Sequence, residues 1–204
     1  EHLSYHSLYS IIPFLRRAGL ELVDVKRVDT QGGAAIGVAS KVTTTERSSF
    51  VGHLLNEEKE LGVENLRAIH KFQDRINEDK KKLKNILENI PKNYSVIAYG
   101  ASRQANFLIE FFKLGEIINY IVDDNTKEKI NKYVPYYKIP IYNTEKINNE
   151  KPYYVIVLAL YHSEKITNVI KNIDNKIQVI CLYPEITVTW IEDLTWSSTR
   201  KVLY

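Results

Sequence analysis

Residues 95–124 constrain the fold of this chain more than any other stretch of the sequence. Residues 95–99 (SVIAY) are largely apolar and end at Gly100, which is the pattern of a short buried strand. An amphipathic helix follows, ends at Gly115, and leads into a second strand over residues 117–122. Strand, helix and strand in this order form a βαβ half-unit, and such units bind ligands at the carboxyl ends of their strands.

The turn after the first strand is Gly100-Ala101-Ser102, where the backbone can approach a ligand closely. It contains one glycine, whereas the dinucleotide-binding fingerprint has three. The pattern therefore predicts a Rossmann-like fold, and a nicotinamide-dependent oxidoreductase is the weakest of the functions considered.

The region 91–186 is predicted to form one Rossmann-like domain. Residues 153–160 form an all-apolar strand, as in a parallel sheet covered on both faces, and Ser163 is the predicted N-cap of the next helix. The following strand contains the single cysteine, Cys181, which we expect to be a buried thiol. The predicted class is α/β, with a doubly wound, mostly parallel sheet.

The remaining regions are assigned from their apolar spacing. Residues 1–45 are predicted to contain a helix and a β-hairpin that turns at Gly32-Gly33, and we interpret them as the last third of a larger α/β domain whose start is missing. Residues 46–90 are predicted to be a helical linker. Residues 187–204 carry both tryptophans and are expected to dock on the body or on a partner, which leaves a homo-oligomer open.

Composition excludes several classes of protein. The formal net charge is +3 over 204 residues, so no nucleic-acid-binding footprint is present. No apolar run reaches membrane-spanning length and no signal peptide is visible, so we expect a cytoplasmic protein that does not bind membranes. The sequence contains no methionine and starts at Glu1, so we expect a fragment or a processed chain. No metal site is predicted within it.

Glu1–Tyr5 (EHLSY) and residues 98–106 (AYGASRQAN) are two motifs that together resemble one family, the S-adenosylmethionine-dependent sugar C-methyltransferases. The first resembles the family's H-E-H-x-S-Y segment, and the second resembles the GYGA-x-x-x-x-N segment of its C-terminal domain. Later landmarks keep the family's order and similar spacing: Gly32-Gly33, Asp123-Asp124-Asn125, Lys138-Ile139-Pro140-Ile141, Leu158-Ala159 and Tyr183-Pro184-Glu185. The resemblance covers nearly the whole chain.

The resemblance implies S-adenosylmethionine as methyl donor and a nucleotide-linked 4-keto deoxysugar as substrate. It also implies a zinc-binding segment and a cofactor domain that would precede this chain, and residues 1–45 would be the C-terminal remnant of that methyltransferase domain. In the family a base removes the proton next to the ketone, and the enolate takes the methyl group. Carried over, His2 would be the base and Glu1 its neighbour, since a neutral imidazole can accept such a proton near neutral pH. The alternative for both residues is a frayed terminus. Because no acidic, glycine-rich cofactor loop occurs here, this part alone is expected to be inactive.

Seven residues are candidates for substrate binding: Tyr99, Gly100, Ala101, Ser102, Asp123, Asp124 and His162. The turn would present amide groups to a phosphate, or it is a tight turn without a ligand. Either aspartate would accept a hydrogen bond from a ribose hydroxyl, or both lie in a solvated loop. The histidine would contact the ligand or cap the following helix.

The sequence departs from the family at ligand-facing positions. Ala34 and Ile36 stand where the family has Ser and Arg, Tyr136 replaces a glycine, and Leu160-Tyr161 replaces a Trp-Asn pair. These departures leave the sugar and even nucleotide binding undetermined. The alternative hypothesis is a non-catalytic nucleotide- or partner-binding Rossmann-like module.

Overall fold

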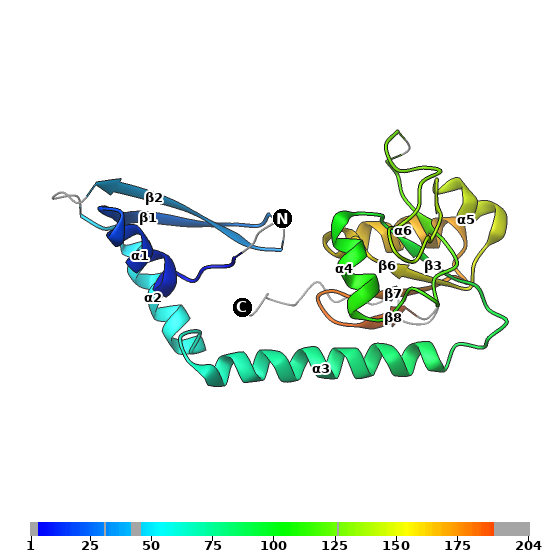
Figure 1. Cartoon of the computed structure of the whole chain (residues 1–204), viewed down its shortest axis with the longest axis horizontal. Helices are drawn as coiled ribbons and strands as arrows, with labels where there is room; N and C mark the ends of the chain where they lie inside the picture. The colour runs from blue at the N-terminus through cyan, green and yellow to red at the C-terminus, as the bar shows by residue number, and fades with distance from the viewer. Residues whose placement is uncertain (1–3, 31, 42–45, 126, 190–204) are drawn as a thin grey trace. The chain divides into compact units, whose positions relative to one another are not determined.

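A computed structural model describes residues 4–30, 32–41, 46–125 and 127–189 (Figure 1). The chain divides into two compact units, Glu1–Asn77 (unit 1) and Glu78–Tyr204 (unit 2). The division falls inside the predicted linker 46–90, within one long helix, α3 (Leu66–Glu88).

Unit 1 is built on an antiparallel hairpin that turns at Gly32-Gly33, as predicted. Its other elements are two helices before and after the hairpin and the first half of α3. The bounds are α1 Leu8–Arg17, β1 Leu20–Val28, β2 Ala34–Lys41 and α2 Ser49–Leu61. A small core lies between α1, α2 and one face of β1, and it contains Leu8, Ile12, Leu22, Val25, Val51 and Leu54.

Both helices of unit 1 begin and end at identifiable residues. The Ser7 side chain accepts the Ser10 N–H at the start of α1, and the Glu58 carboxylate on α2 accepts the Leu8 and Tyr9 N–H groups (2.7 and 3.1 Å). Helix α2 ends at Gly62, whose φ of +66° is the left-handed conformation that favours glycine.

In unit 2, the described residues form a six-stranded sheet with the order β5-β4-β3-β6-β7-β8. All neighbours are parallel except β7 and β8. The bounds are β3 Val96–Tyr99, α4 Arg103–Phe111, β4 Ile121–Val122, β5 Ile141–Tyr142, α5 Glu145–Glu150, β6 Tyr154–Val157, the 3₁₀ turn η1 Leu160–His162, α6 Ser163–Ile173, β7 Gln178–Cys181 and β8 Thr187–Thr189. The predicted α/β class with a mostly parallel, Rossmann-like sheet is confirmed.

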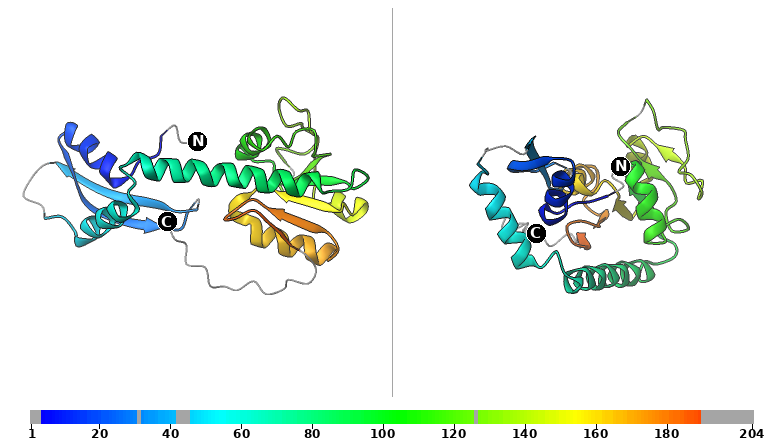
Figure 2. Two further views of the ribbon diagram at one scale, coloured as in Figure 1. Left: turned by 90° about the horizontal axis from the view of Figure 1, so that it is seen from below. Right: turned by 60° about the vertical axis from the view of Figure 1, so that its left-hand side comes forward.

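Helices cover both faces of this sheet (Figures 1 and 2). On one face, Val96 and Ala98 of β3 pack in a core with α4 and with Leu83 of α3. On the other face, Ile97 and Tyr99 pack in a core with α5 and α6. Successive residues of β3 thus enter opposite cores, which explains why all four are buried.

Three local predictions can be compared with the structure. Cys181 is buried, as expected. Ser163 is not the N-cap of α6 but its first residue, and its hydroxyl donates to the Leu160 carbonyl oxygen (2.6 Å). Strand β8, at the start of the predicted docking tail 187–204, pairs antiparallel with β7, while both tryptophans lie outside the described residues.

Candidate functional site

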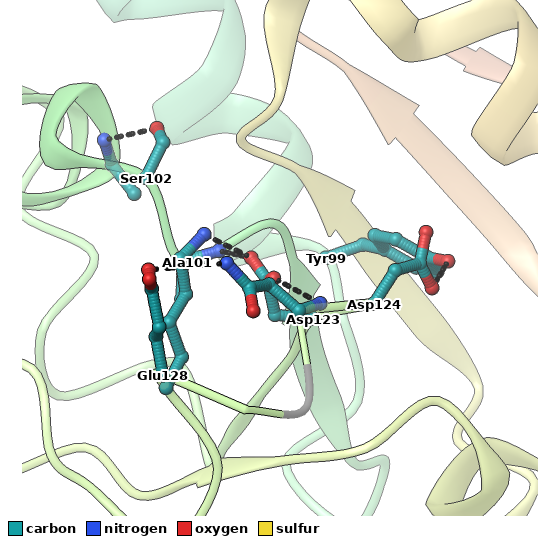
Figure 3. A network of polar contacts seen from close by, with 9 residues as sticks. Tyr99, Ala101, Ser102, Asp123, Asp124 and Glu128 are labelled. Atoms are coloured by element: carbon teal, nitrogen blue, oxygen red, sulfur yellow. Dashed lines mark hydrogen bonds and ion pairs between the residues drawn. The ribbon is translucent and has the colours of Figure 1, made fainter.

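The turn after β3 and the loop after β4 meet at the carboxyl edge of the sheet. Because β3 and β4 are parallel and Tyr99 is in register with Val122, the residues that follow each strand lie side by side. The sheet order reverses between β3 and β6, and such a switch point is where open α/β sheets bind ligands. Figure 3 draws the polar contacts of this edge, including Tyr99, Ala101, Ser102, Asp123 and Asp124. We refer to it as the strand-end site.

Gly100 allows the ends of β3 and β6 to approach each other closely. Its φ is +101°, and a Cβ atom placed there would lie 2.8 Å from the Ala159 Cβ and 3.0 Å from the Ala159 backbone nitrogen. Its N–H donates to the Val122 carbonyl oxygen (2.8 Å), which fixes the turn to β4 as well. A side chain at this position is excluded both by space and by backbone conformation.

Asp123 is a structural clamp in this structure. It is 7% exposed, and its Oδ2 accepts the Ala101 N–H (2.7 Å) and the Lys129 ammonium (3.0 Å). Its Oδ1 accepts the Asn125 N–H (2.8 Å). Burial by itself would raise the pKa of Asp123, but these hydrogen bonds and the charge of Lys129 together hold that pKa below its usual value. Asp123 is therefore ionised, and it holds the turn after β3 against the loop after β4.

Tyr99 and Asp124 form the second pair of the site. The Tyr99 hydroxyl donates to the Asp124 Oδ1 (2.8 Å). Burial, the hydrogen bond to Asp124 and the neighbouring carboxylates raise the pKa of Tyr99 above its ordinary value, so the phenol stays protonated. Asp124 is exposed, unlike Asp123. Its carboxylate can accept further hydrogen bonds besides the one from Tyr99, for example from hydroxyl groups of a ligand.

Ser102 and His162 begin the helices that flank the switch point. Ser102 is the N-cap of α4, and its hydroxyl accepts the Ala105 N–H (3.2 Å). His162 lies on the loop after β6, is exposed, and occupies the N-cap position of α6, but its side chain makes no capping hydrogen bond. Since Ala159, three residues earlier, touches Gly100, the structure brings this loop to the same edge of the sheet as the turn after β3.

Neither Tyr99 nor Asp123 is suited to proton transfer at neutral pH. The raised pKa of Tyr99 keeps its phenol protonated, and the lowered pKa of Asp123 keeps its carboxylate ionised. The predicted base His2 and its neighbour Glu1 lie outside the described residues.

The turn of the strand-end site does not fit S-adenosylmethionine. Asp123 is not available to a ribose, because both of its oxygens are already bound to donors of the chain, and Asp124 is the exposed carboxylate of the site. The turn has one glycine and is closed against Ala159. Among the described residues, no group of three or more His, Cys, Asp or Glu could hold a metal ion. Within the same residues, no helix is long and apolar enough to cross a membrane.

Two residues that contribute to the site were not predicted from the sequence. Lys129 contacts Asp123 from six residues further along the chain, and Ala159 packs on Gly100 from another strand. Lys129 was indistinguishable from the other charged residues of its polar loop. The Ala159 contact depends on the pairing of β3 with β6, which no local pattern reveals.

Comparison with known proteins agrees with this architecture. The family described as C-methyltransferase C-terminal domain matches residues 29–184. C-methyltransferase NovU of Streptomyces niveus is 29% identical over 188 residues, which are 91% of this chain and 45% of that protein. The chain thus spans about half the length of the curated relative it matches. Since the family match covers most of the sequence, the chain belongs to the C-methyltransferase family and contains its C-terminal domain.

Proposed function

We propose that this chain is the C-terminal part of an S-adenosylmethionine-dependent C-methyltransferase that acts on a nucleotide-linked keto-deoxysugar. Unit 2 contributes to binding of the sugar nucleotide. The observation that carries this proposal is the exposed Asp124 carboxylate beside the tight turn at the switch point of a Rossmann-like sheet. The family and the relative support the methyl-transfer chemistry, and the sugar nucleotide is our assignment.

The proposal divides labour between parts of the whole protein. The methyl donor is bound outside the strand-end site, because the turn at Gly100 has one glycine and is closed against Ala159. The two aspartates then have different roles: Asp123 holds the turn in place, and Asp124 accepts hydroxyl groups of the ribose or the sugar. His162, on the loop after β6, approaches the same ligand from the other side of the switch point.

Proton removal is assigned to the amino-terminal motif. His2 is the proposed base for the carbon-bound proton next to the ketone, with Glu1 beside it. The proposal predicts that His2→Ala in the whole enzyme lowers turnover and leaves sugar-nucleotide binding by unit 2 unchanged.

The test is isothermal titration of the chain with S-adenosylmethionine, a panel of nucleotide-sugars and the corresponding free nucleotides. Nucleotide-sugar is expected to bind, and Asp124→Asn is expected to weaken that binding about tenfold by removing a charged hydrogen-bond acceptor. Glu88→Gln, an exposed carboxylate at the end of α3 in the same unit, is the matched control and should change nothing.

Four outcomes would contradict the proposal. Tight binding of S-adenosylmethionine by the chain would overturn the division of labour. Absence of nucleotide-sugar binding, or binding insensitive to Asp124→Asn, would remove the assigned site. Free nucleotide binding as tightly as nucleotide-sugar would favour the non-catalytic nucleotide-binding module.

A further inference from the structure

A hollow of unit 2 lies beside α4 and shares no lining residue with the strand-end site. Its volume is about 440 Å³, which is in the range of small-molecule sites. The lining residues come from α4 and from the loop between β4 and β5: Asn106, Glu110, Val134, Pro135, Tyr136 and Tyr137. We call it the α4 pocket.

The loop that forms one wall of the α4 pocket is held by its own backbone. The Val134 N–H donates to the Ile139 carbonyl oxygen (2.9 Å), and the Lys138 N–H donates back to the Val134 carbonyl oxygen (3.1 Å). Val134 itself is 4% exposed and packs into the core of the unit. The pocket is therefore preformed, which lowers the conformational entropy lost when a ligand binds.

Tyr137 is fixed between a glycine and a carboxylate. A Cβ atom on Gly115 would lie 2.1 Å from the Tyr137 ring, so the ring packs directly on the glycine backbone. The Tyr137 hydroxyl donates to the Glu110 Oε2 (2.5 Å), and the Lys113 ammonium donates to the Glu110 Oε1. Both contacts lower the pKa of Glu110, Lys113 more than Tyr137, so the pocket holds a carboxylate at neutral pH.

Tyr136 is the unusual residue of the pocket. Its ring is 87% exposed, and its φ is +73°, a conformation that is unfavourable for a tyrosine. An exposed ring recovers little burial energy to offset that strain, and strained residues of this kind cluster at ligand sites. Its ring centroid lies 4.9 Å from that of Tyr137 at 77°, so the two rings form a corner.

The chemistry of these side chains indicates one class of ligand. Flat aromatic faces accept the C–H face of a saturated ring, and the Asn106 amide both donates and accepts hydrogen bonds, as ring hydroxyls require. Of the lining side chains that the structure describes, Glu110 alone is charged. Lys113 already pairs with it, so this lining offers no cation to a phosphate. We propose that the α4 pocket binds a single pyranose ring through stacking on Tyr136 and hydrogen bonds to Glu110 and Asn106, with no phosphate contact.

The proposal stands independently of the strand-end site. A pyranose ring occurs both as a free monosaccharide and as the sugar of a nucleotide-sugar, and the experiment separates these two sources. The test is a titration of the chain followed by amide chemical shifts, with glucose, glucosamine, glucose 1-phosphate, UDP-glucose and UDP as probes. We expect glucose to bind with a dissociation constant of about 1 mM, as suits a ligand of this size in an open pocket. Glucosamine should bind more tightly than glucose, and glucose 1-phosphate more weakly.

Tyr136→Gly is the decisive variant, because it removes the ring and also relieves the strained φ. We expect at least a fivefold loss of glucose affinity with no decrease in melting temperature, so lost binding cannot be attributed to unfolding. Tyr133→Ala removes another exposed tyrosine of the same loop that does not line the pocket, and it should leave binding unchanged. Glu110→Gln should abolish the preference for glucosamine.

The nucleotide probes identify where the bound sugar comes from, and an Asp124 variant separates this proposal from the proposed nucleotide-sugar site. Shifts at the pocket with UDP-glucose but not UDP identify the nucleotide-linked sugar, and shifts with glucose alone identify the free sugar. Asp124→Asn should leave glucose binding intact. The proposal is overturned if no probe shifts the pocket residues, if glucose 1-phosphate binds more tightly than glucose, or if Tyr136→Gly binds glucose as the unchanged chain does.

Discussion

Strand β2 of unit 1 and strand β6 of unit 2 are both rich in aliphatic residues, yet their environments are opposite. In β6, Val155, Ile156 and Val157 are all 0% exposed, because α4 and α6 lie on the two faces of the sheet. In β2, Ile36 is 59% exposed and Val38 is 53% exposed. Unit 2 closes its own core on both faces, whereas the described residues of unit 1 cover one face of its hairpin.

The contrast shows what an aliphatic strand does and does not specify. Apolar residues on both faces indicate a strand that can be covered twice, but they do not supply the second cover. Burial of apolar surface stabilises by about 25 cal/mol per Å², so the uncovered face of β2 contributes little to the stability of unit 1. Mutations should therefore act very differently in the two units.

Truncation of one isoleucine in each unit should give the largest difference. Ile97→Ala, in the centre of β3 and 0% exposed, is expected to lower the free energy of unfolding by about 3–4 kcal/mol, because it leaves a cavity in a closed core. Ile36→Ala on β2 should cost about 0.5 kcal/mol or less. Urea unfolding followed by circular dichroism measures both. A loss for Ile36→Ala as large as that for Ile97→Ala would mean that the outer face of β2 is covered in solution.

Two glycines sharpen the comparison with a somewhat smaller effect. Gly100→Ala should cost about 2–3 kcal/mol, since the φ of +101° strains an alanine and its Cβ would collide with Ala159. Gly52→Ala, on the exposed side of α2, meets no atom within 4 Å and should stabilise unit 1 by about 0.5–1 kcal/mol. Thermal unfolding of the two variants should move in opposite directions. A neutral Gly100→Ala would show that β3 and β6 do not approach as closely as described.

The fold of unit 2 was predictable where burial on both faces makes a whole run apolar. Residues 153–160 were predicted to be a strand, and β6 (Tyr154–Val157) lies in the first part of that run, so the prediction was three residues too long at its end. The prediction over residues 117–122 was too long, because β4 comprises only Ile121–Val122. Ile118 and Tyr120 are 5% exposed although they do not belong to the strand. A buried residue outside a strand is as apolar as one inside it, so the sequence pattern cannot tell the two apart. Strand β8 was not predicted, because its short threonine-rich sequence was assigned to the docking tail 187–204.

The sequence predicted which residues of the site lie close together, but it did not predict the role of each. Parallel strands place their carboxyl ends at one edge, so Tyr99, Ala101 and Asp123 were expected near one another and lie there. Nothing in the Asp123-Asp124 pair indicated that the first carboxylate would be buried and the second exposed. That difference arises from the Ala101 amide and Lys129, which reach Asp123 only in the folded chain.

Two carboxylates that receive backbone N–H groups provide the last comparison, with the smallest effects. Asp123→Asn is expected to cost about 1.5–2 kcal/mol at pH 7, because the replacement amide cannot accept from all three donors. Glu58→Gln should cost about 1 kcal/mol, since it weakens only the start of α1 in the less buried unit.

The pH dependence of stability tests the first of these carboxylates directly. Because the folded-state pKa of Asp123 is lower than that of an ordinary aspartate, its contribution is complete above the unfolded-chain value of about 3.9. The contribution is lost as the pH falls from there through the folded pKa, because the unfolded chain then binds the proton first. Urea unfolding should be measured from about pH 6 to about pH 2, which is about two pH units on either side of that value. Over this range Asp123→Asn should lose less stability with acid than the unchanged chain does. Equal losses in the two proteins would mean that Asp123 is not held by the donors assigned to it, and the turn after β3 would need another explanation for its position.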